Sequence, residues 1–120
     1  MRNRKETGYY GEEVARKVLE KRGYHLFAKN YTIRGGEIDL IMTKDNEIVF
    51  VEVKTRRNDH FGSPMEGITP QKKKRMMHAS KVFLAGKDPC RYNIRFFAVA
   101  VFLEENDRVR KVEIYKDIFI

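Results

Sequence analysis

The sequence predicts a mixed α/β domain in which a central sheet is covered by helices. Apolar residues recur at the spacing of an amphipathic helix in two segments, near 6–22 and 69–86, and with a period of two in most of the remaining chain. The predicted order is helix, three strands, helix, two strands, which is typical of a sheet flanked by helices. A chain of 120 residues fits one domain, so we expect residues 1–120 to form a single unit.

The first predicted helix covers residues 6 to about 22 and is followed by Gly23, a residue type that commonly ends helices. With Val14 at its margin, the inward face is formed by Gly11, Ala15, Val18 and Leu19. At 100° per residue Glu12 also lies at the margin of this face, whereas Glu13 points to the opposite side. Glu12 can therefore face the sheet, although an acid in the first turns of a helix is favourable without any function.

The second predicted helix, about 69–86, begins at Thr69-Pro70 and ends at Gly86. Its inner side is expected to carry Met76, Ala79, Ser80, Phe83 and Leu84. Strands are predicted, in order along the chain, at 24–33, 36–43, 47–55, 93–103 and 108–116. The sequence has no internal repeat and no linker between domains.

The chain is basic, with 25 Lys and Arg against 17 Asp and Glu and a net charge of +8. Basic residues concentrate at 54–57 and 71–75, on either side of a Gly- and Pro-containing loop that could bring both runs to one edge. This pattern indicates a polyanionic partner such as nucleic acid. A solvated, solubilising surface explains the same charge balance equally well.

Composition also excludes several classes of protein. No apolar run approaches the roughly 20 residues needed to cross a bilayer, and the N-terminus lacks the apolar core of a signal peptide. We therefore expect no membrane association and a cytoplasmic location. The single cysteine, Cys90, excludes an internal disulfide and a zinc cluster built on cysteines.

The second and third strands carry acids on an otherwise apolar pattern. If Asp45 and Asn46 form the two-residue tip of a hairpin, the numbers of facing residues sum to 91. Asp39 is then opposite Glu52, and Glu37 is opposite Lys54. Period-two alternation puts these four side chains on one face of the sheet. The other face is expected to be core and consists of Ile38, Leu40, Met42, Val49, Val51 and Val53.

Two interpretations of these acids remain open from the pattern alone. A solvated face with alternating charges suits Glu37 with Lys54. It suits Asp39 with Glu52 badly, because like charges directly opposite each other destabilise a sheet by about 0.2–1 kcal/mol. Lys54 supplies one compensating charge, whereas a divalent cation would supply two. Mg²⁺ binds through one or two carboxylates together with water and substrate phosphates, so the second interpretation is a metal site for phosphodiester chemistry.

The motifs "GEIDLI" and "VFVEVKTRR" resemble the PD-(D/E)xK nuclease signature, with Asp39 followed by Glu52-Val53-Lys54. Nearly the whole chain, including "GYYGEEVARKVLEKRGY", "FGSP" and "ITPQKKKRM", is similar to the YraN-like proteins of the UPF0102 family, relatives of archaeal Holliday-junction resolvases. The resemblance implies a restriction-endonuclease-like fold and a nuclease site dependent on Mg²⁺ or Mn²⁺.

The resemblance also implies roles for individual residues. Asp39 and Glu52 would bind the metal, with Glu12 as a further ligand, directly or through water. Lys54 would orient or activate the attacking water or steady the phosphate. Glu37 would support the ligands or a second metal. From their place in the two basic runs, contacts to the nucleic acid are expected from Arg56, Arg57, Gln71, Lys72 and Lys73. A solvated helix face explains Gln71 and Lys72 individually about as well.

One departure from the family pattern lies at the fourth strand. The family usually has Arg-Phe-Asp there, and this chain has Arg95-Phe96-Phe97. Loss of that Asp matters if it organises the site in relatives, and does not matter if it closes a structural ion pair. The sequence leaves both options open.

The function expected from the sequence is Mg²⁺-dependent endonuclease activity on DNA, with branched DNA as a candidate substrate. Two alternatives remain: a nuclease fold reduced to nucleic-acid binding, and a structural or protein-interaction domain without a nucleic-acid role. The sequence does not determine whether the chain forms a homodimer.

Overall fold

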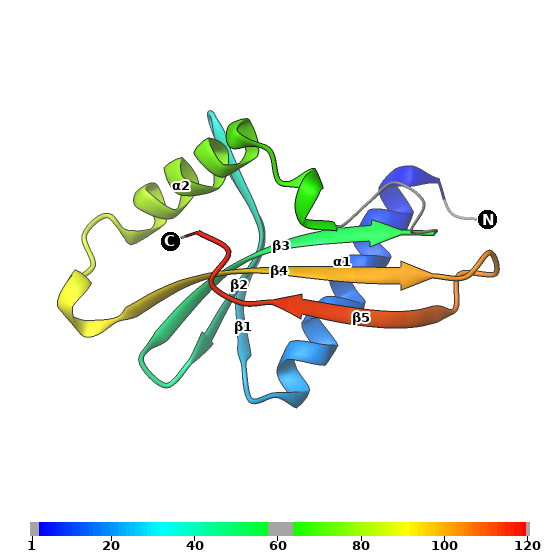
Figure 1. The fold of residues 1–120 in the computed structure, drawn as a ribbon. Coiled ribbons are helices and arrows are strands. Elements are labelled where there is room, and N and C mark those ends of the chain that lie inside the picture. The colour runs from blue at the N-terminus through cyan, green and yellow to red at the C-terminus, as the bar shows by residue number, and fades with distance from the viewer. Residues whose placement is uncertain (1–2, 58–63, 120) are drawn as a thin grey trace.

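The computed structural model describes residues 3–57 and 64–119 (Figure 1). Two helices and five strands follow the predicted order, and two short 3₁₀ helices that the sequence did not predict flank the second helix. In chain order the elements are α1 (Arg4–Lys21), β1 (His25–Ile33), β2 (Gly36–Lys44), β3 (Glu47–Arg56), η1 (Pro64–Gly67), α2 (Pro70–Leu84), η2 (Pro89–Arg91), β4 (Asn93–Leu103) and β5 (Val109–Tyr115).

The five strands form one sheet in the order β1-β2-β3-β4-β5. Neighbouring strands are antiparallel except β3 and β4, which are parallel and are joined through α2. The helices cover opposite faces: α1 packs mainly on β3 and β4, and α2 packs on β2 (Figure 1). The predicted mixed α/β class is confirmed. None of the helices in the described ranges combines the length and apolarity needed to cross a bilayer.

Side-chain caps define where both helices begin. The side chain of Asn3 accepts a hydrogen bond from the backbone nitrogen of Glu6, and Thr69 accepts one from Lys72. Each cap satisfies a main-chain donor that the first turn of a helix leaves without a partner. After α1 the chain reverses at Gly23, whose φ of 95° favours glycine.

Two apolar layers, one under each helix, form the core. The α1 layer contains Ala15, Leu19, Tyr24, Leu40, Met42, Val49, Val51, Phe97, Val99, Val101 and Leu103. The α2 layer contains Ile38, Ile41, Ile48, Phe50 and Ala79. Of the residues predicted on the inner faces, Gly11, Ala15 and Leu19 of α1 and Met76, Ala79 and Ser80 of α2 are buried, whereas Val18, Phe83 and Leu84 are half-buried.

The predicted hairpin register is confirmed over five residue pairs. From Lys44 opposite Glu47 to Leu40 opposite Val51, facing numbers sum to 91. The β2–β3 ladder then ends, so the predicted ladder pairs Asp39 with Glu52 and Glu37 with Lys54 do not form. On its other side β2 remains paired with β1, where Glu37 faces Thr32.

The end of the ladder also changes the facing of β2. Ile38 belongs to the α2 layer with Ile41, although strict alternation assigned it to the face of Leu40 and Met42. The β1–β2 register shifts between Leu26 and Ala28. Farther along, Asn30 and Asp39 are left out of the ladder of paired residues, and Asn30 has a φ of 51°. A local irregularity of this kind shifts the side-chain alternation by one residue, which a period-two argument cannot anticipate.

Candidate functional site

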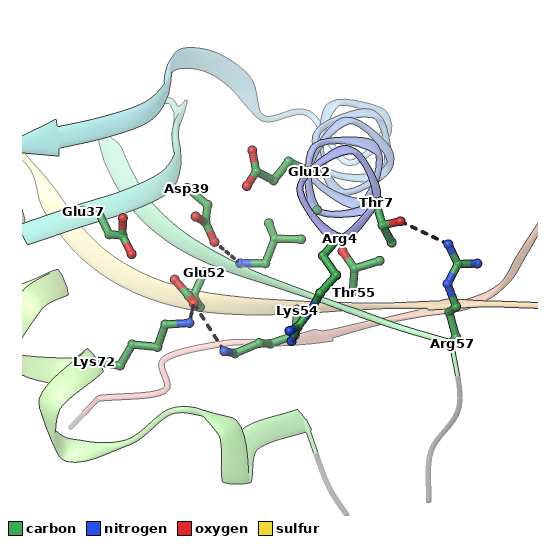
Figure 2. Close-up of a pocket in the computed structure, with 12 residues that line it drawn as sticks. Arg4, Thr7, Glu12, Glu37, Asp39, Glu52, Lys54, Thr55, Arg57 and Lys72 are labelled. Atoms are coloured by element: carbon green, nitrogen blue, oxygen red, sulfur yellow. Dashed lines mark hydrogen bonds and ion pairs between the residues drawn. The ribbon is translucent and has the colours of Figure 1, made fainter. Parts of the chain in front are cut away.

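The acids singled out by the sequence lie in one pocket, between α1, the diverging ends of β2 and β3, and the first turn of α2 (Figure 2). Its volume is about 440 Å³. The lining residues are Arg4, Thr7, Gly8, Glu12, Glu37, Asp39, Glu52, Val53, Lys54, Thr55, Arg57 and Lys72. Every predicted acid and Lys54 is therefore present, together with three α1 residues, Arg4, Thr7 and Gly8, that the sequence did not indicate.

Asp39 is held at the point where the β2–β3 ladder ends. Its Oδ2 accepts a hydrogen bond of 2.8 Å from the backbone nitrogen of Val53 (Figure 2). The side chain therefore satisfies a main-chain donor of β3 just beyond the last β2–β3 pair, Leu40 with Val51. This contact places the Asp39 carboxylate beside that of Glu52, the residue before Val53.

Glu52 is an unusually buried acid, with only 2% of its surface exposed. Its Oε1 lies 2.5 Å from the Nζ of Lys72 and 3.7 Å from the Nζ of Lys54. A buried carboxylate is costly unless it is paired, and the two ammonium groups supply that pairing. Lys54 is thus paired with Glu52 and not with Glu37.

The crowding of acids alters their protonation. Burial, followed by the charge of Glu52, raises the pKa of Asp39 to about 8, against the opposing hydrogen bond from Val53. Burial also raises the pKa of Glu12; a hydrogen bond from Asn30 opposes this shift, and the charges of Glu52 and Glu37 add to it. In both cases burial is the largest cause and the neighbouring carboxylates add to it, so the charged forms of both acids are disfavoured in this pocket.

The pKa values of Lys54 and Lys72 are shifted in opposite directions. Burial, and then the neighbouring Lys72, lowers the pKa of Lys54. Burial also acts against the charge of Lys72, but its hydrogen bond to Glu52 outweighs that effect and raises its pKa. Lys54 is therefore the one of the pair that gives up a proton more readily, and Lys72 is the firmer cation.

Glu12 reaches the pocket as its helical position predicted. It projects from α1 toward Asp39 (Figure 2), while Glu13 forms an ion pair with Arg16 on the outer side of the helix. In the described ranges no three His, Cys, Asp or Glu side chains lie close enough together to bind a metal ion by themselves. Any cation in this pocket would have to complete its coordination with water or substrate oxygens.

Close packing fixes α1 against the sheet beside Glu12. A β-carbon added at Gly11 would lie 1.8 Å from the Oγ1 of Thr55 and 2.9 Å from its Cβ. Only glycine allows the helix to approach β3 this closely. Because Glu12 is the next residue, this contact sets the distance of its carboxylate from Asp39 and Glu52.

The predicted basic residues do not form one continuous surface. Along β3, Arg56 lies toward η1, where a β-carbon at Gly67 would be 3.0 Å from an Arg56 guanidinium nitrogen. Arg57 lies on the α1 side, where it donates a 3.1 Å hydrogen bond to Thr7 (Figure 2). It also forms an ion pair with Asp107. Arg56 is the last residue of β3 and Arg57 follows it, and the two side chains continue the alternation of the strand to opposite faces.

On α2 only Lys72 of the predicted residues lines the pocket. Gln71 and Lys73 are exposed, and the ammonium of Lys73 lies over the ring of Phe119. Residues 58–63 of the loop expected to join the two basic runs are outside the described residues.

Phe97 lies in the α1 layer of the core and not in the pocket. It is fully buried, and its ring packs edge-on against Tyr24 at 5.8 Å between centroids. In β4 it is opposite Val51, whose side chain points away from the face of Glu52. The preceding Arg95 forms ion pairs with Glu47 at 2.8 Å and Asp117 at 2.7 Å. In this chain the ion-pair network at the start of β4 is complete without an acid at position 97.

Comparison with known proteins assigns the family. The family model described as "Uncharacterised protein family UPF0102" matches residues 11–101, a range that includes Glu12, Asp39, Glu52, Lys54 and Lys72. The chain belongs to the UPF0102 family.

Curated UPF0102 relatives match over nearly their whole length. A UPF0102 protein of Clostridium perfringens strain SM101 is 39% identical over 115 residues, covering 96% of this chain and 94% of the relative. One from Syntrophomonas wolfei is 42% identical over 101 residues, covering 84% and 88%. One from Moorella thermoacetica is 35% identical over 116 residues, covering 97% of both chains. The family resemblance predicted from the motifs is confirmed.

Proposed function

We propose that this UPF0102 protein is a metal-dependent endonuclease that hydrolyses phosphodiester bonds in DNA. The observation that carries the proposal is the pairing of a buried acid, Glu52, with a second acid, Asp39, whose pKa is raised to about 8. Such a charge arrangement is unfavourable for folding alone and is typical of functional sites. Lys54, two residues from Glu52 on the same strand, adds a cation beside the acids.

The donor set fits a small, hard divalent cation. Asp39 and Glu52 offer carboxylate oxygens, the ligands that Mg²⁺ and Mn²⁺ accept, and Glu12 lines the same pocket. Two protein carboxylates with water and phosphate oxygens satisfy the usual coordination of Mg²⁺ at phosphoryl-transfer sites. When bound, the cation would neutralise charge that develops on the phosphate and lower the pKa of a bound water.

The protein side chains have separable roles in this proposal. Asp39, fixed by the N–H of Val53, and Glu52 hold the cation, and Glu12 approaches it directly or through water. Burial and the neighbouring Lys72 lower the pKa of Lys54, which favours the neutral amine that would accept a proton from the attacking water. In its protonated form Lys54 would instead steady the phosphate. Glu37, exposed at the rim, supports the ligands or a second cation.

Contacts with the DNA backbone are proposed at both ends of the pocket. Arg57 on the α1 side and Lys72 on the α2 side flank the acids, with Arg56, Gln71 and Lys73 farther out. The net charge of +8 favours association with a polyanion. Backbone contacts of this kind position the substrate without reading its sequence.

A second candidate function is DNA binding without cleavage. It is favoured by the 2.5 Å contact between Lys72 and Glu52, in which an ammonium already neutralises the buried acid. In that case Lys72 would be a permanent replacement for a metal ion. The two candidates predict the same salt-sensitive affinity for DNA and differ in cleavage.

The test is a cleavage assay on linear and branched DNA in chelator, Mg²⁺ and Mn²⁺, with binding measured in parallel over a series of salt concentrations. Endonuclease function predicts cation-dependent cleavage of at least one substrate. Affinity for duplex DNA should fall with salt at a log–log slope of about −0.9 per neutralised phosphate. Binding without cleavage in any cation would support the second candidate. A flat salt response would contradict both and leave a protein-interaction role.

A further inference from the structure

Lys72 occupies the position of a counter-ion for the most buried acid of the pocket. We infer that its ammonium is displaceable: a divalent cation competes with Lys72 for Glu52, and the released ammonium then binds a phosphate of the nucleic acid. This inference rests on the proposed function, because it assumes that Glu52 binds a cation. It assigns Lys72 as a positioning residue that couples cation binding to phosphate binding.

The buried carboxylate of Glu52 requires a cationic partner whether or not a metal ion is bound. Its side chain is only 3% exposed, and the same oxygen, Oε1, faces both Lys72 and Lys54. Asp39 is a second acid beside Glu52, and its Oδ2 already accepts a hydrogen bond from the backbone N–H of Val53. It therefore cannot neutralise Glu52. Leaving a buried carboxylate without a partner is strongly destabilising, so a cation-free pocket requires a lysine on Glu52.

Of the two lysines on Glu52, Lys72 is the one whose ammonium can move away. A β-carbon at Gly67 would lie 3.3 Å from Cε and 3.6 Å from Nζ of Lys54, so η1 confines the end of that side chain. The Lys72 side chain is more exposed, 31% against 19%, and extends across the pocket from α2. Its backbone nitrogen is anchored to Thr69 at 3.1 Å, so the side chain can swing while its base stays fixed.

The ammonium released from Glu52 can bind a phosphate of the nucleic acid. Lys72 is in the first turn of α2, between the exposed residues Gln71 and Lys73, and its own side chain is partly exposed to solvent. A backbone phosphate entering the pocket would meet this side chain next to Glu52. Exchange of Lys72 from carboxylate to phosphate would tie the two binding events together, so each should strengthen the other by the same factor.

The experiment compares Lys72→Met with the unmodified protein. Without DNA, affinity for Mg²⁺ or Mn²⁺, measured by calorimetric titration, should rise about tenfold in Lys72→Met, because the competing ammonium is absent. Thermal melts should show a lower midpoint for the variant in chelator and a larger upward shift on adding the cation. A residue with a structural role only would lower the midpoint equally in both conditions.

Matched variants separate the ion pair from general effects of charge. Lys74→Met removes a lysine from the exposed surface of the same helix and should leave the cation affinity unchanged. Lys72→Arg keeps a positive charge and should keep the weaker cation affinity of the unmodified protein. If Lys72→Met does not fold, Lys72→Gln provides the same comparison with a neutral polar side chain.

The coupling itself is measured with duplex DNA at constant ionic strength, in chelator and in Ca²⁺. The gain in DNA affinity on adding Ca²⁺ should be smaller in Lys72→Met than in the unmodified protein. If the unmodified protein binds Mg²⁺ or Mn²⁺ and Lys72→Met binds it no more tightly, the inference about Lys72 fails and the proposed function stands. If no divalent cation binds the unmodified protein, the proposed metal site fails first.

Discussion

The Oδ2 of Asp39 lies 2.8 Å from the backbone nitrogen of Val53, at the point where the β2–β3 ladder ends. One carboxylate thereby supports the strand separation that opens the pocket and also lies beside Glu52. Its burial and that neighbouring charge raise its pKa to about 8. The same side chain therefore links the fold, the charge of the pocket and the proposed chemistry.

Replacing Asp39 with Asn should stabilise the cation-free protein increasingly as the pH rises. The amide oxygen can still accept the hydrogen bond from Val53, while the unfavourable buried charge is removed. Asp39 has a raised folded-state pKa, so its contribution to stability is complete below its unfolded value of 3.8 and is lost as the pH rises to about 8. The stability gain of Asp39→Asn over the unmodified protein should thus grow between pH 4 and pH 8, by at most about 1.4 kcal/mol per pH unit.

Denaturant unfolding of both proteins in chelator across this range measures the gain. A variant that is less stable at every pH by a couple of kcal/mol would identify Asp39 as a purely structural acceptor. In excess Mg²⁺ the order should reverse, because a neutral amide is a poorer ligand for a hard cation.

Affinity for Mg²⁺ or Mn²⁺ should itself depend on pH. A cation can bind Asp39 only when the carboxylate is ionised, so protons compete with it below the pKa of about 8. Affinity should rise by up to about tenfold per pH unit between pH 6 and pH 8 and level off above that range. Calorimetric titrations at each pH test this, and release of protons on binding should accompany them. An affinity independent of pH would argue that Asp39 is not a ligand.

Two glycines of α1 should respond in opposite ways to the same change. Gly11→Ala puts a methyl group 1.8 Å from Thr55 Oγ1, so α1 must move away from β3 at a cost of about 1–3 kcal/mol. Gly8→Ala meets no atom within 4 Å and should stabilise the helix by up to about 1 kcal/mol. Thermal or denaturant unfolding compares the two. Equal effects would show that the close seating of α1 on Thr55 does not contribute to stability.

Introducing at position 97 the acid expected from the family resemblance should damage this protein. Phe97→Asp introduces a carboxylate into the fully buried α1 layer and removes the ring that packs on Tyr24. We expect a loss of several kcal/mol and no gain in cleavage. Phe97→Leu, which keeps an apolar side chain, should cost much less. A stable Phe97→Asp protein with increased cleavage would instead place this position in the site.

Lys54→Ala tests the proposed chemistry directly. If Lys54 acts at the scissile phosphate, cleavage should fall by at least about 100-fold, while DNA affinity stays within a few-fold. Lys74→Ala, which removes an exposed lysine of α2, should leave cleavage intact. Single-turnover cleavage rates and binding isotherms separate the two effects. Equal cleavage by Lys54→Ala and the unmodified protein would remove Lys54 from the mechanism.

The sequence alone predicted much of the fold, since its signals are local. The helical spacing of apolar residues and the stop at Gly23 predicted α1. The turn residues Asp45-Asn46 predicted the hairpin register, which is correct from the pair Lys44–Glu47 to the pair Leu40–Val51. Helical geometry also placed Glu12 toward the sheet. These predictions succeeded because caps, turns and side-chain periodicity depend on neighbours along the chain.

Other features depended on contacts between distant segments. The β2–β3 ladder ends where the Asp39 side chain accepts the N–H of Val53. Beyond this point Ile38 lies in the α2 layer, and Glu37 does not pair with Lys54. The docking of α2 brought the ammonium of Lys72 onto Glu52, twenty residues earlier in the chain. The sequence thus determined which charged residues this protein carries and on which elements, because these follow from local patterns. Only tertiary packing decided which charges meet, because burial makes each unpaired charge costly and selects its partner across the fold.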